Sequence, residues 1–196
     1  MVKIGAVITA AGKSSRMGSF KPLLKIGNLT VAEKVIQNFH IAGVKDIVLV
    51  TGNNAEELER SLEPTGLVFL RNERYEYNEM FDSVKIGLNY LKETCDKVFI
   101  TPVDVPIFAP GTVEALLKTK ANIGIPTYNG ETGHPIILDS IAIKKILGFS
   151  GDGGLRDAIK NLSLDVEYIE TGDEGILYDM NTQADYDRIL RLHDNL

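Results

Sequence analysis

The sequence predicts an α/β fold in which a mostly parallel central sheet is flanked by helices. Short apolar runs alternate along the chain with segments of helical spacing, which is typical of parallel strands joined by crossover helices. Each run is nearly continuous rather than alternating, as expected for strands covered on both faces. No linker and no fixed-period repeat interrupts this pattern, so we expect one domain over residues 1–196.

The predicted core strands are the apolar runs Ile4–Thr9, Asp46–Thr51, Leu67–Leu70 and Lys97–Thr101. Later extended segments are expected as an insertion in the sheet or an extension of it, at Ile123–Pro126, Pro135–Leu138 and Val166–Ile169, with a turn at Asn129-Gly130. Ligands of doubly wound sheets bind beyond the carboxyl ends of the strands, so the segments that follow the strands are candidates for function.

The helices between the strands carry their own start signals. Thr30 and Glu33 have the spacing of a capping box that opens a helix, and Gly43 ends it. Asn54, with Glu57 after it, marks a second start. Further helices are predicted at Phe81–Thr94, Pro110–Thr119, Ile141–Leu147 and Leu155–Leu162, and a terminal helix begins at Thr182.

Composition excludes several classes of protein. The net charge of -6 argues against a protein that wraps nucleic acid, because such binding draws on clustered Lys and Arg. Cys95 is the only cysteine, which excludes an intramolecular disulfide and suits a reducing compartment. The first apolar run is too short to span a membrane and lacks a cleavage-site pattern. We expect a cytoplasmic protein with neither nucleic acid nor membrane as a partner.

The stretch TAAGKSSRMGSFK, Thr9–Lys21, follows the first predicted strand. Its AGKS string is similar to the end of a P-loop, but Val7 stands where a P-loop needs glycine. The small residues after the strand allow a base or phosphate to approach the backbone, and three cations follow within short reach: Lys13, Arg16 and Lys21. These features favour an anion-binding loop over a merely solvated basic one.

A second candidate lies after the fourth predicted strand, in the stretch TPVDVP. Asp104 stands between Pro102 and Pro106, which would hold its carboxylate in position at a strand end. Magnesium fits such a position because it binds through one or two carboxylates and shares its other positions with water and phosphates. From Asp104 alone, an aspartate that merely caps or turns the chain is an equal alternative.

Several motifs together resemble one family. They are TAAGKSSRMGSFKPLL, PVDVP, GHP at Gly133–Pro135, GDGGLRD at Gly151–Asp157 and DMNTQADY at Asp179–Tyr186. In this order and spacing they resemble the MobA-like nucleotidyltransferases, in particular the molybdopterin cytidylyltransferase branch. The resemblance implies a three-layer α/β/α fold of the nucleotide-diphospho-sugar-transferase type, which is Rossmann-like and agrees with the strand pattern.

The resemblance also implies roles for individual residues. Nucleotide binding would fall to the small residues of the loop, its cations and a serine in the middle of the chain: Ala10, Ala11, Gly12, Lys13, Arg16, Lys21 and Ser83. Arg16, Lys21 and Asp104 would be catalytic. Mg²⁺ would be held by Asp104 and Asn181, with Asp179 a less certain ligand.

The implied reaction is Mg²⁺-dependent transfer of NMP from an NTP, with CTP favoured, to a phosphorylated small molecule, with release of pyrophosphate. Molybdopterin is the favoured acceptor, and a molybdoenzyme that receives the product is an implied partner. A sugar or polyol phosphate is the alternative acceptor. A dinucleotide-dependent oxidoreductase is disfavoured because the glycines of the first loop fall only at Gly12 and Gly18. A non-catalytic nucleotide-binding regulator stays open.

The middle of the chain departs from the family pattern. Where the cytidylyltransferase branch has a glycine, then Met and a serine run, this chain has Glu79, Phe81 and Asp82 around Met80 and Ser83. This departure puts specificity for base or acceptor in doubt, unless the segment simply starts a helix with Asp82 in its first turn. His134 has two interpretations, a contact to the acceptor or a turn residue, and its place between Gly133 and Pro135 favours the turn residue.

Overall fold

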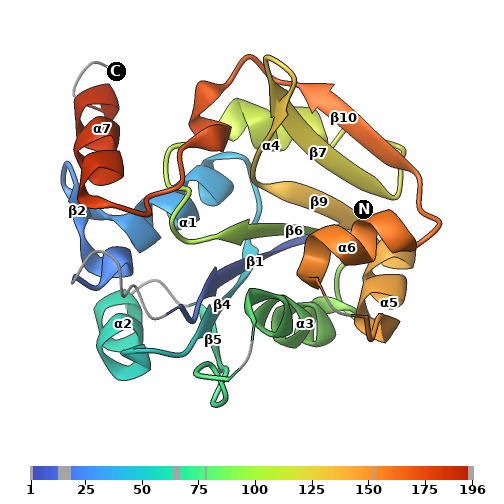
Figure 1. Cartoon of the computed structure of the whole chain (residues 1–196), viewed down its shortest axis with the longest axis horizontal. Helices are drawn as coiled ribbons and strands as arrows, with labels where there is room; N and C mark the ends of the chain where they lie inside the picture. The colour runs from blue at the N-terminus through green and yellow to red at the C-terminus, as the bar shows by residue number, and fades with distance from the viewer. Residues whose placement is uncertain (1, 13–18, 64–66, 78, 152, 194–196) are drawn as a thin grey trace.

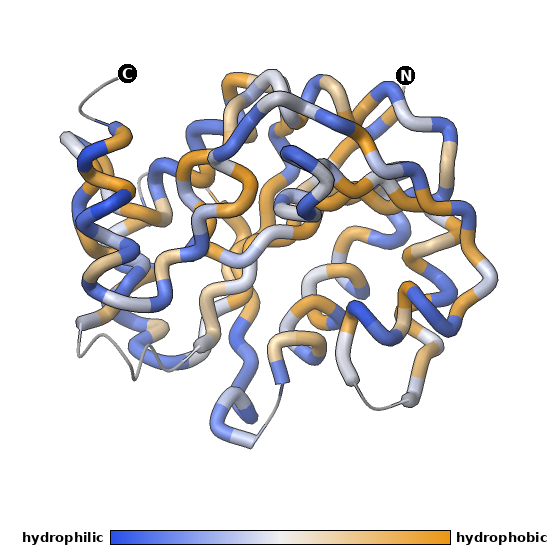
Figure 2. Tube along the Cα trace, turned by 45° about the horizontal axis from the view of Figure 1, so that its top comes forward, coloured by the Kyte–Doolittle hydropathy of each residue, from blue (hydrophilic) through white to orange (hydrophobic). Residues whose placement is uncertain are grey.

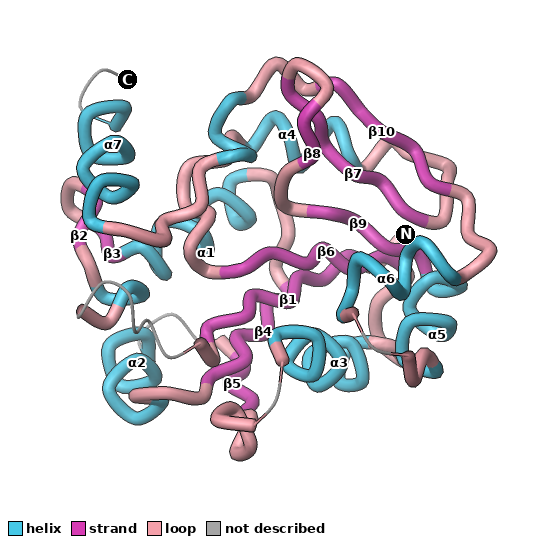
Figure 3. The backbone as a smooth tube through the Cα atoms, viewed as in Figure 1, coloured by secondary structure: helices cyan, strands magenta, loops and turns pink. Residues whose placement is uncertain are grey.

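The computed structural model describes residues 2–12, 19–63, 67–77, 79–151 and 153–193, and it confirms the predicted α/β class. One sheet has the strand order β10-β7-β9-β6-β1-β4-β5, with β8 paired to β7. Figure 3 shows these strands as one continuous sheet between the helices. The strands are β1 Ile4–Ala10, β4 Asp46–Thr51, β5 Val68–Arg71, β6 Lys97–Pro102, β7 Ile123–Tyr128, β8 Glu131–Thr132, β9 Ile136–Asp139 and β10 Val166–Glu170.

The sheet is mostly parallel. β1 pairs in parallel with β4 and with β6, β4 with β5, and β10 with β7. β9 runs antiparallel to both of its neighbours, β6 and β7. The predicted late strands therefore extend the sheet, and the segment Pro135–Leu138 supplies the strand whose direction is reversed.

Helices cover both faces of the sheet, and the alternation of side chains along β1 explains why. Ala6 and Ile8 belong to one buried cluster. Val7, which lies between them in the strand, belongs to a second cluster. Each cluster also contains residues of helices. Figure 1 shows the helices on the two sides of the sheet, and Figure 2 shows the hydrophobic residues along its strands. Successive residues of a strand point to opposite faces, so a continuous apolar run yields three layers.

The helices begin close to the predicted residues. They are α1 Val31–Ile41, α2 Ala55–Leu62, α3 Met80–Leu91, α4 Pro110–Leu116, α5 Ser140–Gly148, α6 Gly154–Asn161 and α7 Gln183–His193. The capping box at α1 is confirmed: the Thr30 N–H donates to Glu33 Oε2 at 2.6 Å and the Glu33 N–H donates to Thr30 Oγ1 at 3.1 Å. Asn54 precedes α2, but it has φ 50 and makes no side-chain cap.

Short elements that the sequence did not predict bring distant segments together. They are η1 Lys21–Leu23, the hairpin of β2 Lys25–Ile26 and β3 Leu29–Thr30, and η3 Glu174–Leu177. The predicted turn at Asn129-Gly130 is confirmed, with φ 50 and 82, and it joins β7 to β8. Within the described part of the chain, no helix is long and apolar enough to cross a membrane.

Candidate active site

The two candidate segments, the loop after β1 and the stretch with Asp104 after β6, begin at the same edge of the sheet. β1 and β6 are parallel neighbours, with Thr9 opposite Pro102, so the loops that follow them leave the sheet side by side. A cavity of about 440 Å³ lies at this edge. Its lining includes the small residues Ala10, Ala11 and Gly12 on one side, and Asp104 with Asn181 on the other. Parallel pairing thus places Ala11 and Gly12, at the start of the predicted anion-binding loop, in the same cavity as the candidate metal ligand Asp104.

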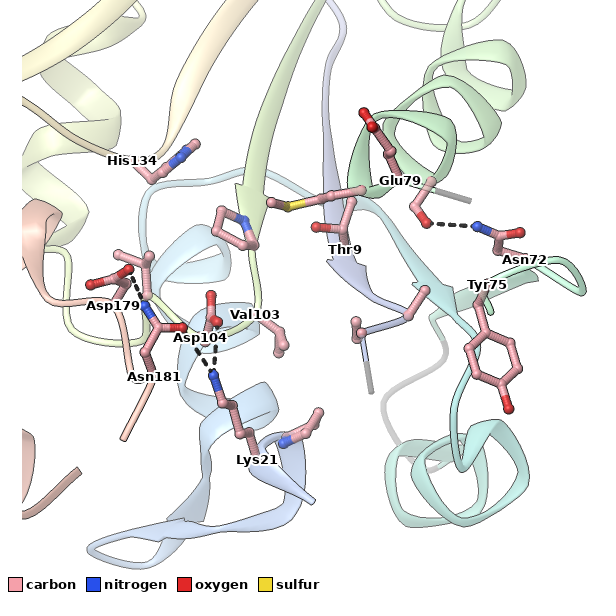
Figure 4. Close-up of a pocket in the computed structure, with 18 residues that line it drawn as sticks. Thr9, Lys21, Asn72, Tyr75, Glu79, Val103, Asp104, His134, Asp179 and Asn181 are labelled. Carbon is pink, nitrogen blue, oxygen red and sulfur yellow. Dashed lines mark hydrogen bonds and ion pairs between the residues drawn. The ribbon is translucent and has the colours of Figure 1, made fainter. Parts of the chain in front are cut away.

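Lys21 joins these parts. Its side chain is 10% exposed, and its Nζ lies 3.4 Å from Asp104 Oδ2 and 3.3 Å from Asn181 Oδ1. Figure 4 shows the ammonium between the two oxygens. Lys21 begins the short helix η1, in which Pro22 occupies the first turn. The resemblance implied a contact to phosphate for Lys21; the structure adds a contact to the candidate metal ligands.

The segment before α7 holds Asn181 in place. The Asn181 and Thr182 N–H groups donate to Asp185 Oδ2 at 3.1 Å and 2.7 Å, so Asp185 anchors this turn. The Thr182 hydroxyl donates to the same oxygen at 2.8 Å, and this hydrogen bond, together with the two from the backbone, lowers the pKa of Asp185. The Asn181 side-chain N–H donates to the Asp179 carboxylate, which leaves the amide oxygen directed at Lys21. The Met180 N–H donates to the Asp104 carbonyl at 2.8 Å and ties this turn to the β6 loop.

Asp104 is a partly desolvated carboxylate. Burial raises its pKa, and the Lys21 ammonium opposes this shift. The described residues contain no group of three or more His, Cys, Asp or Glu side chains that could hold a metal ion. The oxygens of Asp104 and Asn181 suit a hard cation that takes only part of its coordination from protein. The donor set therefore fits Mg²⁺ bound together with substrate phosphates.

The loop after β1 is close-packed on one side and open on the other. Ala10 and Ala11 are 3% and 8% exposed, whereas a Cβ added to Gly12 would meet no atom within 4 Å. Gly52 allows the chain after β4 to approach this loop closely, because a Cβ at this position would lie only 2.9 Å from the Ala11 carbonyl oxygen. Lys13 and Arg16, the other predicted cations, lie outside the described residues.

The opposite wall comes from α3 and the loop before it. Ser83 is buried and accepts a hydrogen bond from Asn72 Nδ2 at 3.0 Å. Asn72 and Tyr75 also line the cavity (Figure 4). Sequence reasoning missed both residues because no motif marks the loop after β5.

The three residues that depart from the family pattern, Glu79, Phe81 and Asp82, have different environments in the structure. Phe81 is packed inside: its ring lies edge-on to that of Phe149, 6.3 Å between centroids. Asp82 accepts a hydrogen bond from the Glu79 N–H at 3.0 Å, so it has a helix-starting role. Glu79 is exposed and lines the cavity. Of these three residues, only Glu79 lines this cavity.

His134 lies in a bend between Gly133 and Pro135, as expected of a turn residue. It also lines the cavity, and its Nδ1 is buried without a hydrogen-bond partner among the described residues. Burial lowers its pKa, although the Ile100 carbonyl and the Asp179 charge oppose the shift. The ring is therefore neutral near pH 7.

Known proteins match this chain along most of its length. Residues 6–166 match the family described as the MobA-like NTP transferase domain. The chain belongs to this family. It is a nucleotidyltransferase, and it is 29% identical over 189 residues to the molybdenum cofactor cytidylyltransferase of Escherichia coli (strain K12), a match that covers 95% of each chain.

Two solved structures share the fold of this MobA-like chain. A nucleotidyl transferase from Methanothermobacter thermautotroptrophicus superposes with a TM-score of 0.87 at 24% identity, covering 98% of both chains. Rv0371c from Mycobacterium tuberculosis, solved in complex with manganese, superposes with a TM-score of 0.78 at 20% identity, covering 97% of this chain and 99% of the other. At these identities the similarity establishes the fold.

Proposed function

We propose that this nucleotidyltransferase transfers CMP from CTP to molybdopterin, in a reaction that depends on Mg²⁺ and releases pyrophosphate. The observation that carries the proposal is the group Lys21, Asp104 and Asn181 facing the open backbone of the β1 loop across one cavity. The similarity to a molybdenum cofactor cytidylyltransferase over 95% of the chain supports the choice of nucleotide and acceptor.

The chemistry needs no nucleophile from the protein. A phosphate oxygen of the acceptor is ionised near neutral pH and attacks the α-phosphorus in line with the departing pyrophosphate. The chain's task is then to position the two phosphates and to balance their charge. Ala10, Ala11 and Gly12 hold the nucleoside against the backbone. Lys21, with Lys13 and Arg16 as the resemblance implies, balances the triphosphate.

Asp104 and Asn181 hold the metal, with Asp179 orienting the Asn181 amide. When bound, Mg²⁺ supplies charge stabilisation and a fixed geometry for the phosphates. The Lys21 ammonium, which contacts both metal-holding side chains, turns to the phosphates in the loaded enzyme. A molybdoenzyme is the proposed recipient of the product.

Two measurements test this proposal. The first is thermal unfolding with each of the four nucleoside triphosphates and Mg²⁺. A ligand that binds only the native state at about 100 times its Kd stabilises by about 2.7 kcal/mol. We expect the largest shift with CTP. No shift with any triphosphate would contradict nucleotide binding itself.

The second measurement is pyrophosphate release by Asp104→Asn, with Asp139→Asn as the matched control. Asp139 caps α5 by accepting a hydrogen bond from the Ala142 N–H at 2.8 Å, away from the cavity. We expect Asp104→Asn to lose about 100-fold or more in turnover, the size typical for removal of one electrostatic contact to the transition state. Asp139→Asn should keep its turnover. Near-normal release by Asp104→Asn would contradict the assignment, and binding without release by the wild type would favour a regulatory module.

A further inference from the structure

The central sheet has an open edge at β10. Figure 3 shows β10 at one margin of the sheet, where it pairs with β7, and no strand of the described chain pairs with its outer side. Such an edge offers N–H and C=O groups to another strand, and proteins blunt it with Lys, Pro or a bulge. β10 has the sequence VEYIE, without Lys or Pro, and its residues pair one to one with those of β7. None of these devices therefore protects the edge.

Alternate residues of β10 direct their backbone groups away from β7. The Asp165 carbonyl accepts a hydrogen bond from an N–H of β7 at 3.0 Å, and the Thr171 N–H donates one to a carbonyl of β7 at the same distance. Backbone groups along a strand alternate in direction, so residues of this parity bond to β7. The N–H and C=O groups of Val166, Tyr168 and Glu170 consequently point outward.

The side chains of β10 suit a second strand. Tyr168, at its centre, is 62% exposed, whereas β5, the other edge strand, is described in full and has no exposed large apolar side chain. The two carboxylates of β10 are held to their own chain: Glu167 accepts a hydrogen bond from Thr119 Oγ1, and Glu170 accepts one from Thr127 Oγ1 at 3.0 Å. An aromatic ring therefore stands at the middle of the open edge.

An antiparallel copy of β10 fits this edge in one symmetric register. With Tyr168 opposite Tyr168 of the second copy, Val166 lies opposite Glu170, and every outward residue belongs to a hydrogen-bonded pair. Glu167 then lies opposite Ile169, so no two carboxylates are directly opposed. A two-fold axis at Glu167 would oppose two carboxylates, which is destabilising. An axis at Ile169 would leave Val166 without a partner in the strand.

We propose that β10 is an interaction surface for a second copy of this chain, and that two copies join by antiparallel pairing of their β10 strands about Tyr168. The two sheets then form one continuous sheet. β1, β6, β7 and β10 run in the same direction, so β10 ends at the edge of the sheet that holds the candidate active site. An antiparallel partner has its own site at the opposite edge of the joint sheet, and the pairing covers neither.

The first test is sedimentation velocity of the whole chain over a range of concentrations. We expect the wild-type mass to rise from 21.5 kDa towards twice that value as the concentration increases. Tyr168→Glu places two like charges opposite each other at the self-paired position, and we expect it to weaken association by about tenfold or more. Tyr90→Glu is the matched control, because it adds the same charge at a tyrosine of α3 that is 50% exposed. This control should associate like the wild type.

The second test is a cross-link at the proposed two-fold axis. Opposite residues of a hydrogen-bonded antiparallel pair have Cα atoms about 5.5 Å apart, within the range that a disulfide spans. Oxidation should therefore join Tyr168→Cys into a covalent dimer. Tyr90→Cys is the control and should cross-link far more slowly. The native Cys95 is buried and present in both variants, so it contributes equally to each.

Three results would each overturn this inference. They are a wild type that stays monomeric at every concentration, a Tyr168→Glu protein that associates as tightly as the wild type, and a Tyr168→Cys protein that cross-links no faster than Tyr90→Cys. Circular dichroism reports whether each variant is folded, and the cysteine pair decides the question if Tyr168→Glu does not fold. Nucleotide and acceptor take no part in these experiments, so their outcome is independent of the proposed function.

Discussion

Replacing Lys21 by methionine removes the ammonium that lies between Asp104 and Asn181 while keeping a side chain of similar length. At the observed separation of 3.4 Å from Asp104, the pair interacts by about 5 kcal/mol at an effective dielectric constant near 20, and by about 1 kcal/mol in bulk water. The two side chains are 10% and 24% exposed, so the environment lies between these limits. We expect a coupling energy of about 2 kcal/mol between Lys21 and Asp104.

The assay is urea unfolding without metal or nucleotide, in a double-mutant cycle of Lys21→Met and Asp104→Asn. Each single variant leaves one buried polar group without its partner, and the double variant removes both charges, so its loss should be smaller than the sum of the single losses. The Glu174–Arg188 pair is the control. Its side chains are 46% and 58% exposed, and such pairs contribute at most about 1 kcal/mol.

A coupling energy near zero in the Lys21–Asp104 cycle would refute the argument. It would mean that water, rather than Lys21, compensates the Asp104 charge. Turnover is an independent readout of the same variant, because loss of an ammonium that balances phosphate charge is expected to reduce kcat by about 100-fold or more. A stable Lys21→Met protein with normal turnover would exclude a catalytic role for Lys21.

Three further predictions follow from single positions. Gly87→Ala should destabilise by about 1 to 3 kcal/mol in urea unfolding, because the added Cβ would lie 2.4 Å from Val7 Cγ1; Gly148→Ala, whose Cβ meets no atom within 4 Å, is the control. The lowered pKa of His134 means that the unfolded chain binds a proton first as pH falls below 6.5, so stability should fall from pH 7.5 to about 5.5, and less so in His134→Asn. Glu79→Gln should lower the KM for the acceptor several-fold without changing kcat, since Glu79 is an exposed carboxylate in the wall of the cavity where a phosphate must enter; an unchanged KM would contradict this.

The fold was predictable because its strands carry a strong signal. β1, β4 and β6 are buried on both faces, so their apolar runs are continuous and their positions follow directly. The capping box of Thr30 and Glu33 is equally local. The β2–β3 hairpin and η3 were missed because each is only a few residues long and depends on contacts made by the folded chain.

The site was predictable only where a motif marks it. The resemblance named Lys21, Asp104 and Asn181, and the structure brings these residues together. It could not indicate that Asn72 contacts Ser83, or that Nδ1 of His134 is buried without a partner, because both depend on how distant segments pack. The roles of Lys13 and Arg16 stay predictions.

The contact between Lys21 and Asp104 also bears on how the charges of the site are paired with and without substrate. A desolvated carboxylate needs a nearby positive charge, and in the absence of substrate Lys21 supplies it. In the proposed function, magnesium and a triphosphate would together bring both a cation for Asp104 and anions for Lys21, so each group would exchange one partner for another. Among the described residues, the other oxygen that Lys21 contacts belongs to the neutral amide of Asn181, so Asp104 is the carboxylate with which this ammonium pairs. A free cation would have to displace Lys21 without offering it a new partner, and the proposed site would therefore take the metal together with its nucleotide.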